Sequence, residues 1–372
     1  MIKVLSLLLF YLLHISYIIY AYHVDQLKII DSVTGYLFIL FHLSFIIYWY
    51  LFKKHLFSFK HIVICSLLYI GSPPLFENDH YRYIWEGKVL AAGENPYTNA
   101  PNAKKLDSIV YSKRHEIAYN KLTTIYPPLA QVYFFIVSPF NYRWALIIMQ
   151  MISCLLVLYL FKNLFTVQRE LIVLITPFLF KEFIQSIHLD IVAVVLLFYF
   201  IQKKWFLTGI LLSFLTKIIS ILCLPFYLIE ALFHSRKDTY NILCIGILML
   251  GILYLYPASR SFSSGGEAFI KTWFWNSLLG TPLIALGLEQ SSVRIILISC
   301  FVGIYILLCC YHIKEKGTYT DFYNTFSFYI LFLFSPVLHP WYLLWPLIFI
   351  KNHKYYYYFI AVSFLAYFPY LN

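Results

Sequence analysis

Residues 4–22, VLSLLLFYLLHISYIIYAY, form an apolar run that contains no lysine, arginine, aspartate or glutamate. The hydrocarbon core of a bilayer is about 30 Å thick, and a helix of about 20 such residues crosses it. A lysine precedes the run, but Tyr22, His23 and Val24 stand where the small residues of a signal-peptide cleavage site would be expected. The run therefore predicts a retained first membrane-spanning helix.

Similar runs recur along the whole chain. Because backbone polar groups in lipid must be satisfied within a segment, each run predicts a helix. We expect an all-α polytopic membrane protein with about 11–13 spans, organised as a single domain over residues 1–372. The candidate spans are residues 4–22, 33–52, 60–74, 143–162, 169–185, 189–202, 205–217, 219–233, 240–257, 293–312, 322–336, 341–350 and 355–371.

The composition agrees with a membrane protein. Hydrophobic residues make up 61% of the chain and charged residues 12%, whereas a soluble domain has about 25% charged residues. The net charge of +11 comes from small basic clusters between apolar runs, which is not the continuous basic face of a nucleic-acid-binding protein. Because lysine and arginine favour the cytoplasmic side, we expect a cytoplasmic N-terminus. The expected location is a bacterial inner membrane, with the active site facing the periplasm.

One long polar stretch interrupts the apolar pattern. Residues 77–99, ENDHYRYIWEGKVLAAGENPYTN, open a first outer loop that we place at residues 75–140. Its end, residues 127–140, follows a Tyr-Pro-Pro turn that a regular helix interior would not accept, so we expect a re-entrant or interfacial helix there. A second outer loop is expected at residues 258–290.

Four ionisable residues lie at span ends on the same predicted side of the membrane: Asp79, Asp190, Lys217 and His339. Ionisable groups at membrane depth are costly and often functional. A carboxylate can accept a proton from a hydroxyl, and a lysine can neutralise charge on a leaving phosphate. The residues alone leave other roles open. Asp79 could form only local ion pairs, Lys217 could extend its charge to the interface, and His339 could be structural.

Short motifs follow one another in a fixed order. Asp79, Tyr81, Arg82 and Tyr83 come first, then Gly93, Asn95, Pro96 and Tyr97, then Tyr126, Pro127 and Pro128. HLD at 188–190, GILLSFLTK ending at Lys217, FWNS at 274–277 and HPWYLLWP at 339–346 follow. This order resembles integral-membrane glycosyltransferases of the C superfamily (GT-C), in the branch of polyprenyl-phosphate-mannose-dependent mannosyltransferases.

The resemblance implies a GT-C bundle and an inverting transfer of one hexose, with mannose preferred, from a polyprenyl-phosphate sugar to a hydroxyl of a glycolipid or glycan. Asp79 would be the catalytic base, and Glu86 could share that role. Lys217, His339 and Arg260 would bind the donor phosphate. No cofactor is implied, and a metal held by Glu77, Asp79 and Glu86 is disfavoured because lysine can neutralise a monophosphate. The implied sugar- or acceptor-binding residues are Arg82, Glu86, Asn95, Tyr97, Tyr126, His188, Asp190 and Trp341.

Three rival classes remain at this point. A transporter or lipid flippase also has many spans, but it usually shows repeated halves, and no repeat is visible here. A surface-polysaccharide polymerase or ligase would use a diphosphate-linked donor and would be expected to carry an arginine-rich outer loop. A non-catalytic scaffold would tolerate neutralisation of both Asp79 and Lys217.

Overall fold

The computed structural model describes residues 1–27, 32–55, 58–235, 246, 248, 268, 271–350 and 354–371, without the side chains of residues 27, 32, 55, 165–168 and 369–371. Among these residues there are helices and connecting segments but no strand. A single parallel bridge joins Trp275 and Val337. The predicted all-α class is confirmed. The candidate span at 240–257 lies almost entirely outside the described residues.

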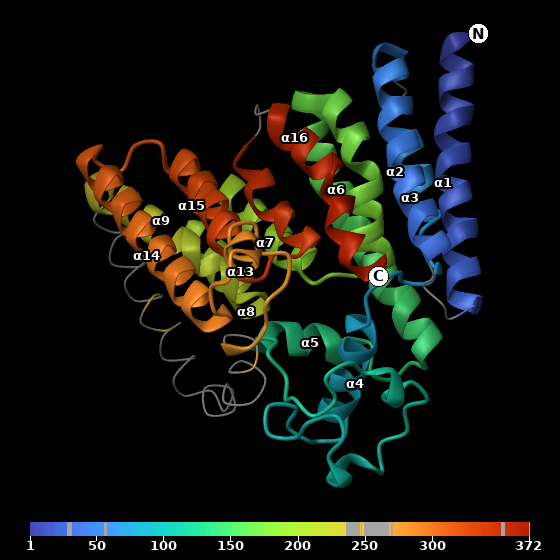
Figure 1. Cartoon of the computed structure of the whole chain (residues 1–372), viewed down its shortest axis with the longest axis horizontal. Coiled ribbons are helices and arrows are strands. Elements are labelled where there is room, and N and C mark those ends of the chain that lie inside the picture. Colours follow the sequence, from blue (N-terminus) through green and yellow to red (C-terminus); the bar gives the residue numbers. More distant parts are fainter. Residues whose placement is uncertain are drawn as a thin grey trace.

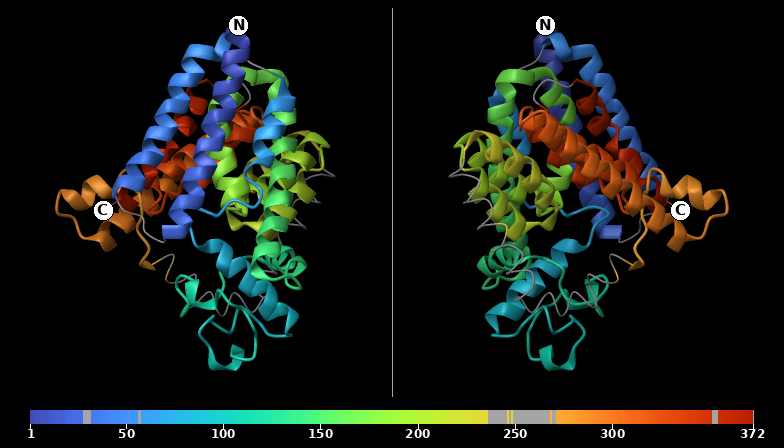
Figure 2. Two further views of the ribbon diagram at one scale, coloured as in Figure 1. Left: turned by 90° about the vertical axis from the view of Figure 1, so that its right-hand side faces the viewer. Right: turned by 90° about the vertical axis from the view of Figure 1, so that its left-hand side faces the viewer.

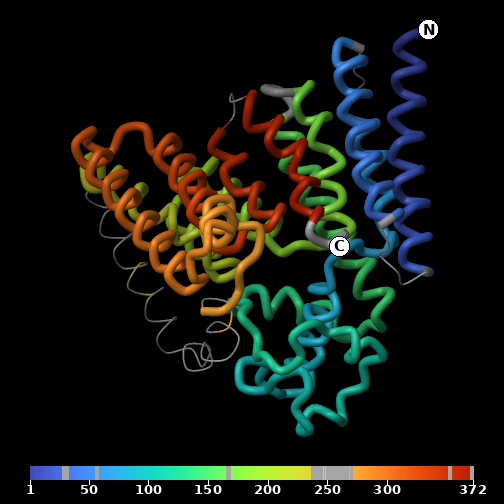
Figure 3. Tube along the Cα trace, in the orientation of Figure 1, coloured from blue at the N-terminus to red at the C-terminus, as the bar shows by residue number. Residues whose placement is uncertain are grey.

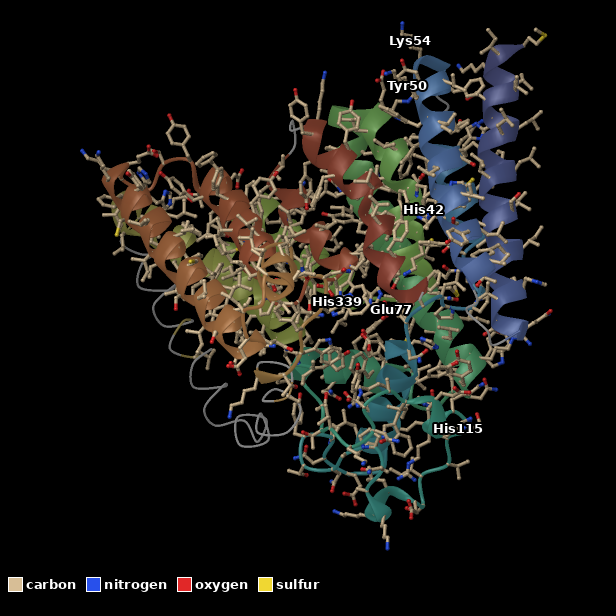
Figure 4. All side chains as sticks on the ribbon, in the orientation of Figure 1. His42, Tyr50, Lys54, Glu77, His115 and His339 are labelled. Atoms are coloured by element: carbon tan, nitrogen blue, oxygen red, sulfur yellow. The ribbon has the colours of Figure 1, made fainter. Side chains whose placement is uncertain are left out.

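The chain forms a helical bundle with a smaller lobe at one end (Figure 1). The lobe, called the loop lobe here, comprises residues 75–140. It contains the helices α4 (Asp79–Ala91) and α5 (Pro128–Ile136) and the short turns η2 (Lys104–Leu106) and η3 (Arg114–Glu116). Figure 2 shows from two sides that the loop lobe projects from one end of the bundle. The N-terminus and Lys54 lie at the opposite end (Figures 1 and 4).

Figure 3 traces the path of the chain through the bundle. Its α-helices are α1 (Ile2–Leu27), α2 (Ser32–Phe52), α3 (Phe59–Leu67), α6 (Tyr142–Leu179), α7 (Asp190–Gln202), α8 (Phe206–Thr216), α9 (Leu224–His234), α13 (Gly280–Ala285), α14 (Gln290–Lys314), α15 (Thr320–Phe334) and α16 (Lys354–Ala361). Tighter or wider turns are η1 (Lys53–His55), the π-helix η4 (Phe180–Gln185), η5 (Ile218–Cys223), η6 (Pro340–Ile348) and η7 (Ser363–Leu371).

Fewer helices than expected are long enough to cross a membrane alone. Within the described residues there are four: Ile2–Gln26, Val33–Phe52, Tyr142–Leu164 and Gln290–Lys314. A bent pair, Arg169–Gln185 with Asp190–Gln202, brings the number to five. The expected 11–13 full spans are therefore not reached in this part of the chain. Several apolar runs are short helices instead, because a proline or a polar residue ends or bends them, as at Lys217 and Pro340.

The loop lobe has its own hydrophobic core. Tyr83, Trp85, Phe134 and Ile187 are buried together with Met149 from the start of α6, so that the bundle anchors the lobe. Helices α4 and α5 pack against each other at backbone distance. A Cβ atom on Gly87 would lie 2.1 Å from the carbonyl oxygen of Phe134, and only glycine permits such an approach.

Two breaks in regular structure lie close to the loop lobe. The first follows α6, where η4 leads into Ile187 at φ 53° and the chain bends by 110° between the flanking helices. The second is Lys217, whose extended backbone at φ −148° separates α8 from η5. Such breaks direct side chains out of the helical pattern. His188 and Asp190 follow the first break, and Lys217 forms the second.

Candidate active site

A polar pocket of about 280 Å³ lies where the loop lobe meets the bundle. In Figure 4, His339 and Glu77 mark this junction. The predicted site residues that line it are Asp79, Arg82, Tyr126, Lys217, His339 and Trp341, and Glu77, Tyr119, Trp273 and Tyr342 join them. The fold thus brings Asp79 and Lys217, which are far apart in the sequence, into one cavity.

Asp79 occupies the first turn of α4 and is partly exposed. Its Oδ2 accepts a long hydrogen bond of 3.4 Å from the hydroxyl of Tyr83, one turn further along the helix. The positive end of the helix dipole favours a carboxylate at this position. Asp79 therefore faces the pocket with a weakly held oxygen, which a proton acceptor needs.

Lys217 is held by a buried carboxylate. Its Nζ lies 3.0 Å from Oδ2 of Asp190, whose side chain is fully buried, while 21% of the Lys217 side chain remains exposed. Trp345 donates a hydrogen bond of 2.7 Å to the other oxygen of Asp190. Burial opposes a charge on Lys217, but Asp190, with contributions from Tyr342 and Asp79, raises its pKa above the ordinary value. The ammonium therefore stays charged at the pocket wall.

Two residues expected to contact sugar lie behind the pocket instead. Asp190 and His188 are both buried and do not line it. Asp190 has its two oxygens engaged by Lys217 and Trp345, so it orients the lysine rather than presenting an oxygen to a ligand. His188 stacks on Trp341 with ring centroids 3.7 Å apart.

Trp341 stands between two histidines. Its indole is nearly parallel to His188, at 16°, and to His339, at 7°, with a centroid distance of 4.3 Å to the latter. Two imidazole rings cannot share one face at these distances, so they cover opposite faces. Stacking of Trp341 on a sugar ring, which the sequence suggested, is therefore blocked, and the indole offers only its edge to the pocket.

His339 lines the pocket although it is largely buried. Burial, together with His188 and Lys217, lowers the pKa of His339 to about 3. The imidazole is thus neutral near pH 7 and can donate one N–H, but it brings no charge. In the described structure its Nδ1 makes no hydrogen bond.

Arg82 and Glu86 mainly organise the loop lobe. Arg82 donates hydrogen bonds of 2.8–3.1 Å to the backbone carbonyls of residues 118, 119 and 122, and also lies 3.4 Å from Glu86. Glu86 accepts from Thr124 at 2.7 Å and from Gln131 at 2.6 Å and does not line the pocket. Burial raises its pKa, although these partners act in the opposite direction. This placement does not fit the direct contact with sugar expected of Glu86.

The Gly-x-Asn-Pro-Tyr motif holds the turn before α5. Asn95 Oδ1 accepts a hydrogen bond of 2.9 Å from the backbone N–H of Tyr97, and the hydroxyl of Tyr97 donates to the carbonyl of Tyr126. Neither Asn95 nor Tyr97 lines the pocket, contrary to expectation. They position Tyr126, which does line it.

An apolar pocket of about 380 Å³ adjoins the polar one. The two pockets share Ile125, Tyr126, Lys217 and Tyr342. Further lining comes from Ile218, Ile298, Leu331, Phe332 and Val337, together with Arg294. The ammonium of Lys217, 5.6 Å from the ring centre of Tyr342, therefore stands between a polar and an apolar space.

The sequence interpretation missed a buried ionic cluster. Lys181 Nζ lies 3.1 Å from Oε1 of Glu182, and His188 Nε2 lies 3.3 Å from Oε2 of the same carboxylate. The hydroxyl of Tyr367 accepts a hydrogen bond from Lys181 and donates one to Glu182. The available signal was the Lys-Glu pair inside the apolar run 169–185, since charges in such runs mark functional positions.

The predicted phosphate contact of Arg260 and the expected absence of a metal are not tested by the structure. Arg260 lies outside the described residues. Within the ranges that are described, no group of three or more histidine, cysteine, aspartate or glutamate side chains is arranged to hold a metal ion.

Similarity to a known protein family covers the part of the chain that contributes Asp79 and Lys217 to the polar pocket, but not the part that contributes His339 and Trp341. The family model described as alpha-(1->6)-mannopyranosyltransferase, N-terminal domain (MptA/B family) matches residues 37–232, just over half of the chain. The matched part runs from α2 to α9 and includes Asp79, Asp190 and Lys217. No curated protein and no solved structure matches the chain.

Proposed function

Because the chain belongs to the MptA/B family of alpha-(1->6)-mannopyranosyltransferases, we propose that it transfers mannose from a polyprenyl-phosphate carrier to a hydroxyl of a glycan or glycolipid. Mannosyl transfer is the activity of the family. The lipid donor, the inverting course and the roles of single residues are our proposals. Asp79 is assigned as the base, and Lys217 and His339 as the groups that bind the donor phosphate.

The arrangement of the two pockets is the observation that carries the proposal. A polyprenyl phosphate has an apolar chain and an anionic head, so it needs an apolar groove that ends at a cation. Lys217 lines both pockets. A carrier lying in the apolar pocket would place its phosphate beside this ammonium and its sugar in the polar pocket, on the side of Asp79.

The proposed step is a single displacement. The carboxylate of Asp79 takes the proton of the acceptor hydroxyl, and the acceptor oxygen forms a bond to the anomeric carbon. The bond between that carbon and the phosphate oxygen breaks, and its electron pair leaves with the phosphate. Attack from the side opposite the phosphate inverts the configuration. The proton on Asp79 is then released to solvent through the pocket.

The leaving phosphate requires stabilisation. Lys217 supplies a charge, since Asp190 keeps it ionised. His339 supplies a neutral N–H, because its pKa is about 3. Fixed donors and cations that meet developing charge in a partly desolvated site provide much of the rate enhancement of enzymes. A lysine alone can neutralise a monophosphate, so the proposal assigns no metal.

The orientation follows from the ends of the bundle. Lys54 and the N-terminus lie at the end opposite the loop lobe (Figures 1 and 4). Basic residues favour the cytoplasmic side, so we place the loop lobe and the polar pocket on the outer side of the membrane. We further propose that this membrane is a bacterial inner membrane.

The test is a transfer assay with the purified full-length protein in detergent or nanodiscs. Donors are polyprenyl-phosphate mannose, polyprenyl-phosphate glucose, a polyprenyl-diphosphate sugar and a nucleotide-linked mannose, and the acceptor is an α-(1→6)-linked mannose oligosaccharide. We expect a product one mannose longer only with polyprenyl-phosphate mannose. Mass spectrometry gives the added mass, and NMR gives the configuration of the new bond.

Other results would assign another function. Product formation from the diphosphate donor alone would indicate a polymerase or ligase. Movement of the lipid-linked sugar across a vesicle membrane without a new glycosidic bond would indicate a transporter or flippase. Full activity after simultaneous neutralisation of Asp79 and Lys217 would contradict the assigned roles.

A further inference from the structure

The buried ionic cluster of Lys181, Glu182, His188 and Tyr367 has no part in the chemistry described so far. Each of its four side chains is at most 2% exposed, and none lines the polar or the apolar pocket. Charges at this depth are costly unless they are paired, and they are seldom kept without a role. We therefore expect the cluster to be connected structurally to the polar pocket.

A chain of direct contacts provides that link. Glu182 Oε2 lies 3.3 Å from Nε2 of His188, and the ring of His188 covers one face of Trp341 at a centroid distance of 3.7 Å. The opposite face of Trp341 carries His339, at 4.3 Å and 7°. His339 lines the polar pocket. The carboxylate of Glu182 is thus two contacts away from Trp341, which also lines the pocket, and three contacts away from His339.

The backbone supports the same link. Glu182 lies in the π-helix η4, and His188 follows Ile187, a β-branched residue with φ 53°. Left-handed backbone is rare for β-branched residues, and π-helical turns frequently occur at functional sites. Strained conformations persist only where surrounding contacts hold them. Here the strain brings the side chain of His188 back toward Glu182 and onto Trp341.

We propose that Glu182 is a positioning residue for the donor-phosphate site. It orients His188, His188 holds the indole of Trp341, and the indole fixes His339 at the pocket wall. Lys181 balances the charge of Glu182, and the hydroxyl of Tyr367 bonds to both. The proposal rests on the proposed function insofar as His339 contacts the donor phosphate.

The first measurement is binding of polyprenyl monophosphate to the purified Glu182→Gln variant. Groups that orient a histidine in metal sites change affinity or activity by about 10–100-fold, and we expect a loss near the lower end, about tenfold. The KM for the acceptor should stay unchanged, because the acceptor side of the pocket is built by the loop lobe. Glu182→Asp should recover part of the affinity.

A second measurement does not depend on activity. The near-ultraviolet circular dichroism of Trp341 is obtained by subtracting the spectrum of Trp341→Phe from that of the parent. An indole fixed between two rings should give a clear signal. We expect the same subtraction in the Glu182→Gln background to give little or none.

His312→Gln is the matched control. His312 is fully buried in the bundle and lies 3.1 Å from the carbonyl of Phe226, away from both pockets. This variant should lose stability but keep the affinity for polyprenyl phosphate and the Trp341 signal. If Glu182→Gln does not fold, Tyr367→Phe removes only one partner of Glu182 and should give a smaller change in the same direction.

The outcomes separate the two proposals. An unchanged Trp341 signal together with unchanged phosphate affinity in folded Glu182→Gln or Tyr367→Phe would overturn the positioning role. Equal losses in His312→Gln would overturn it as well, because they would reflect general destabilisation. A wild-type protein that transfers no mannose would overturn the proposed function, while the spectroscopic test of Glu182 would still stand.

Discussion

Two aspartates, one in the loop lobe and one in the bundle, meet the polar pocket in different ways. Asp79 lines the pocket, is partly exposed and accepts one long hydrogen bond from Tyr83. Asp190 is fully buried behind the wall, and Lys217 and Trp345 occupy both of its oxygens. The same functional group therefore has a free oxygen in one region and none in the other.

Under the proposed function, the difference separates a reacting group from a supporting one. A carboxylate that accepts a proton needs an oxygen within reach of the substrate, which Asp79 has. A buried carboxylate whose two oxygens are both engaged by partners contributes through the partner that it orients. Neutralising each aspartate should therefore change different observables, and the following experiments use that contrast.

The largest effect is expected from Asp79→Asn. Loss of a general base lowers kcat by about 10²–10⁴-fold, while donor affinity and thermal stability should change little. The measurement is the transfer rate at saturating donor. Asp107→Asn is the control, because Asp107 is an exposed carboxylate of the same lobe, paired with Arg114. A similar rate loss in both variants would contradict a specific role for Asp79.

Lys217→Met should affect both activity and folding. Loss of the cation at the phosphate should lower kcat/KM by about 10²–10³-fold, and the unpaired Asp190 should cost about 3–5 kcal/mol of stability. The double variant Lys217→Met with Asp190→Asn removes the unpaired charge. It should recover most of the stability, as measured by thermal unfolding in detergent, but none of the activity.

The double variant is the decisive comparison. Recovery of activity along with stability would mean that Lys217 acts only in folding. Failure to recover stability would mean that the pair contributes more than charge compensation.

Gly87→Ala tests whether the placement of Asp79 depends on the contact of α4 with α5. The added Cβ would lie 2.1 Å from a backbone oxygen, so the helices must separate at a cost of about 1–3 kcal/mol. Gly303→Ala in α14 is the control, because no atom beyond its own helical turns lies within 4 Å of its added Cβ. It should stabilise the protein by about 0.4–1 kcal/mol. Equal thermal shifts in both variants would contradict the close packing.

The smallest effect concerns pH. The pKa of His339 falls from 6.5 to about 3 in the folded protein, so the unfolded chain binds its proton first as the pH drops. Stability should therefore decrease as the pH falls from 6.5 toward 3, with no contribution above 6.5. His339→Asn should flatten that part of the curve of unfolding temperature against pH. His80, with its pKa also lowered to about 3, should keep part of the remaining slope.

Donor affinity provides a companion measurement. His339 stays neutral across the physiological range. The affinity for polyprenyl phosphate should therefore depend on pH in the same way in the parent protein and in His339→Asn. An inflection near pH 6.5 that His339→Asn removes would show that the imidazole carries charge at the pocket wall.

Apolar runs predicted the helical class well, since periodic segments of about 20 residues have few alternatives in lipid. Within the described residues, fewer helices than expected are long enough to cross a membrane alone, because hydropathy does not show that an apolar run forms only a short helix. Lys217 and the turn at Ile187 break segments that looked like ordinary span ends. Long helices such as α1, α2 and α14 were predicted close to their observed bounds.

The site was only partly predictable for a related reason. Residue type and motif selected Asp79, Lys217 and His339 as candidates, and the fold brings them into one cavity. The sequence could not show that Asp190 faces Lys217 rather than the pocket, or that Trp341 has both faces covered. The first fact depends on a contact between residues 27 positions apart, and the second on the contact of Trp341 with His188, about 150 positions away. The Lys-Glu pair inside an apolar run was a visible signal for Glu182, but the sequence could not show its partner Tyr367, which comes from the far end of the chain.

The wall shared by the two pockets also bears on repeated turnover. In the proposed reaction the spent carrier sits in the apolar pocket and the lengthened glycan in the polar one. The carrier would diffuse sideways into the bilayer, and a fresh one would enter by the same route, without crossing the space that holds the glycan. Exchange of the carrier would then leave the glycan side of the polar pocket undisturbed.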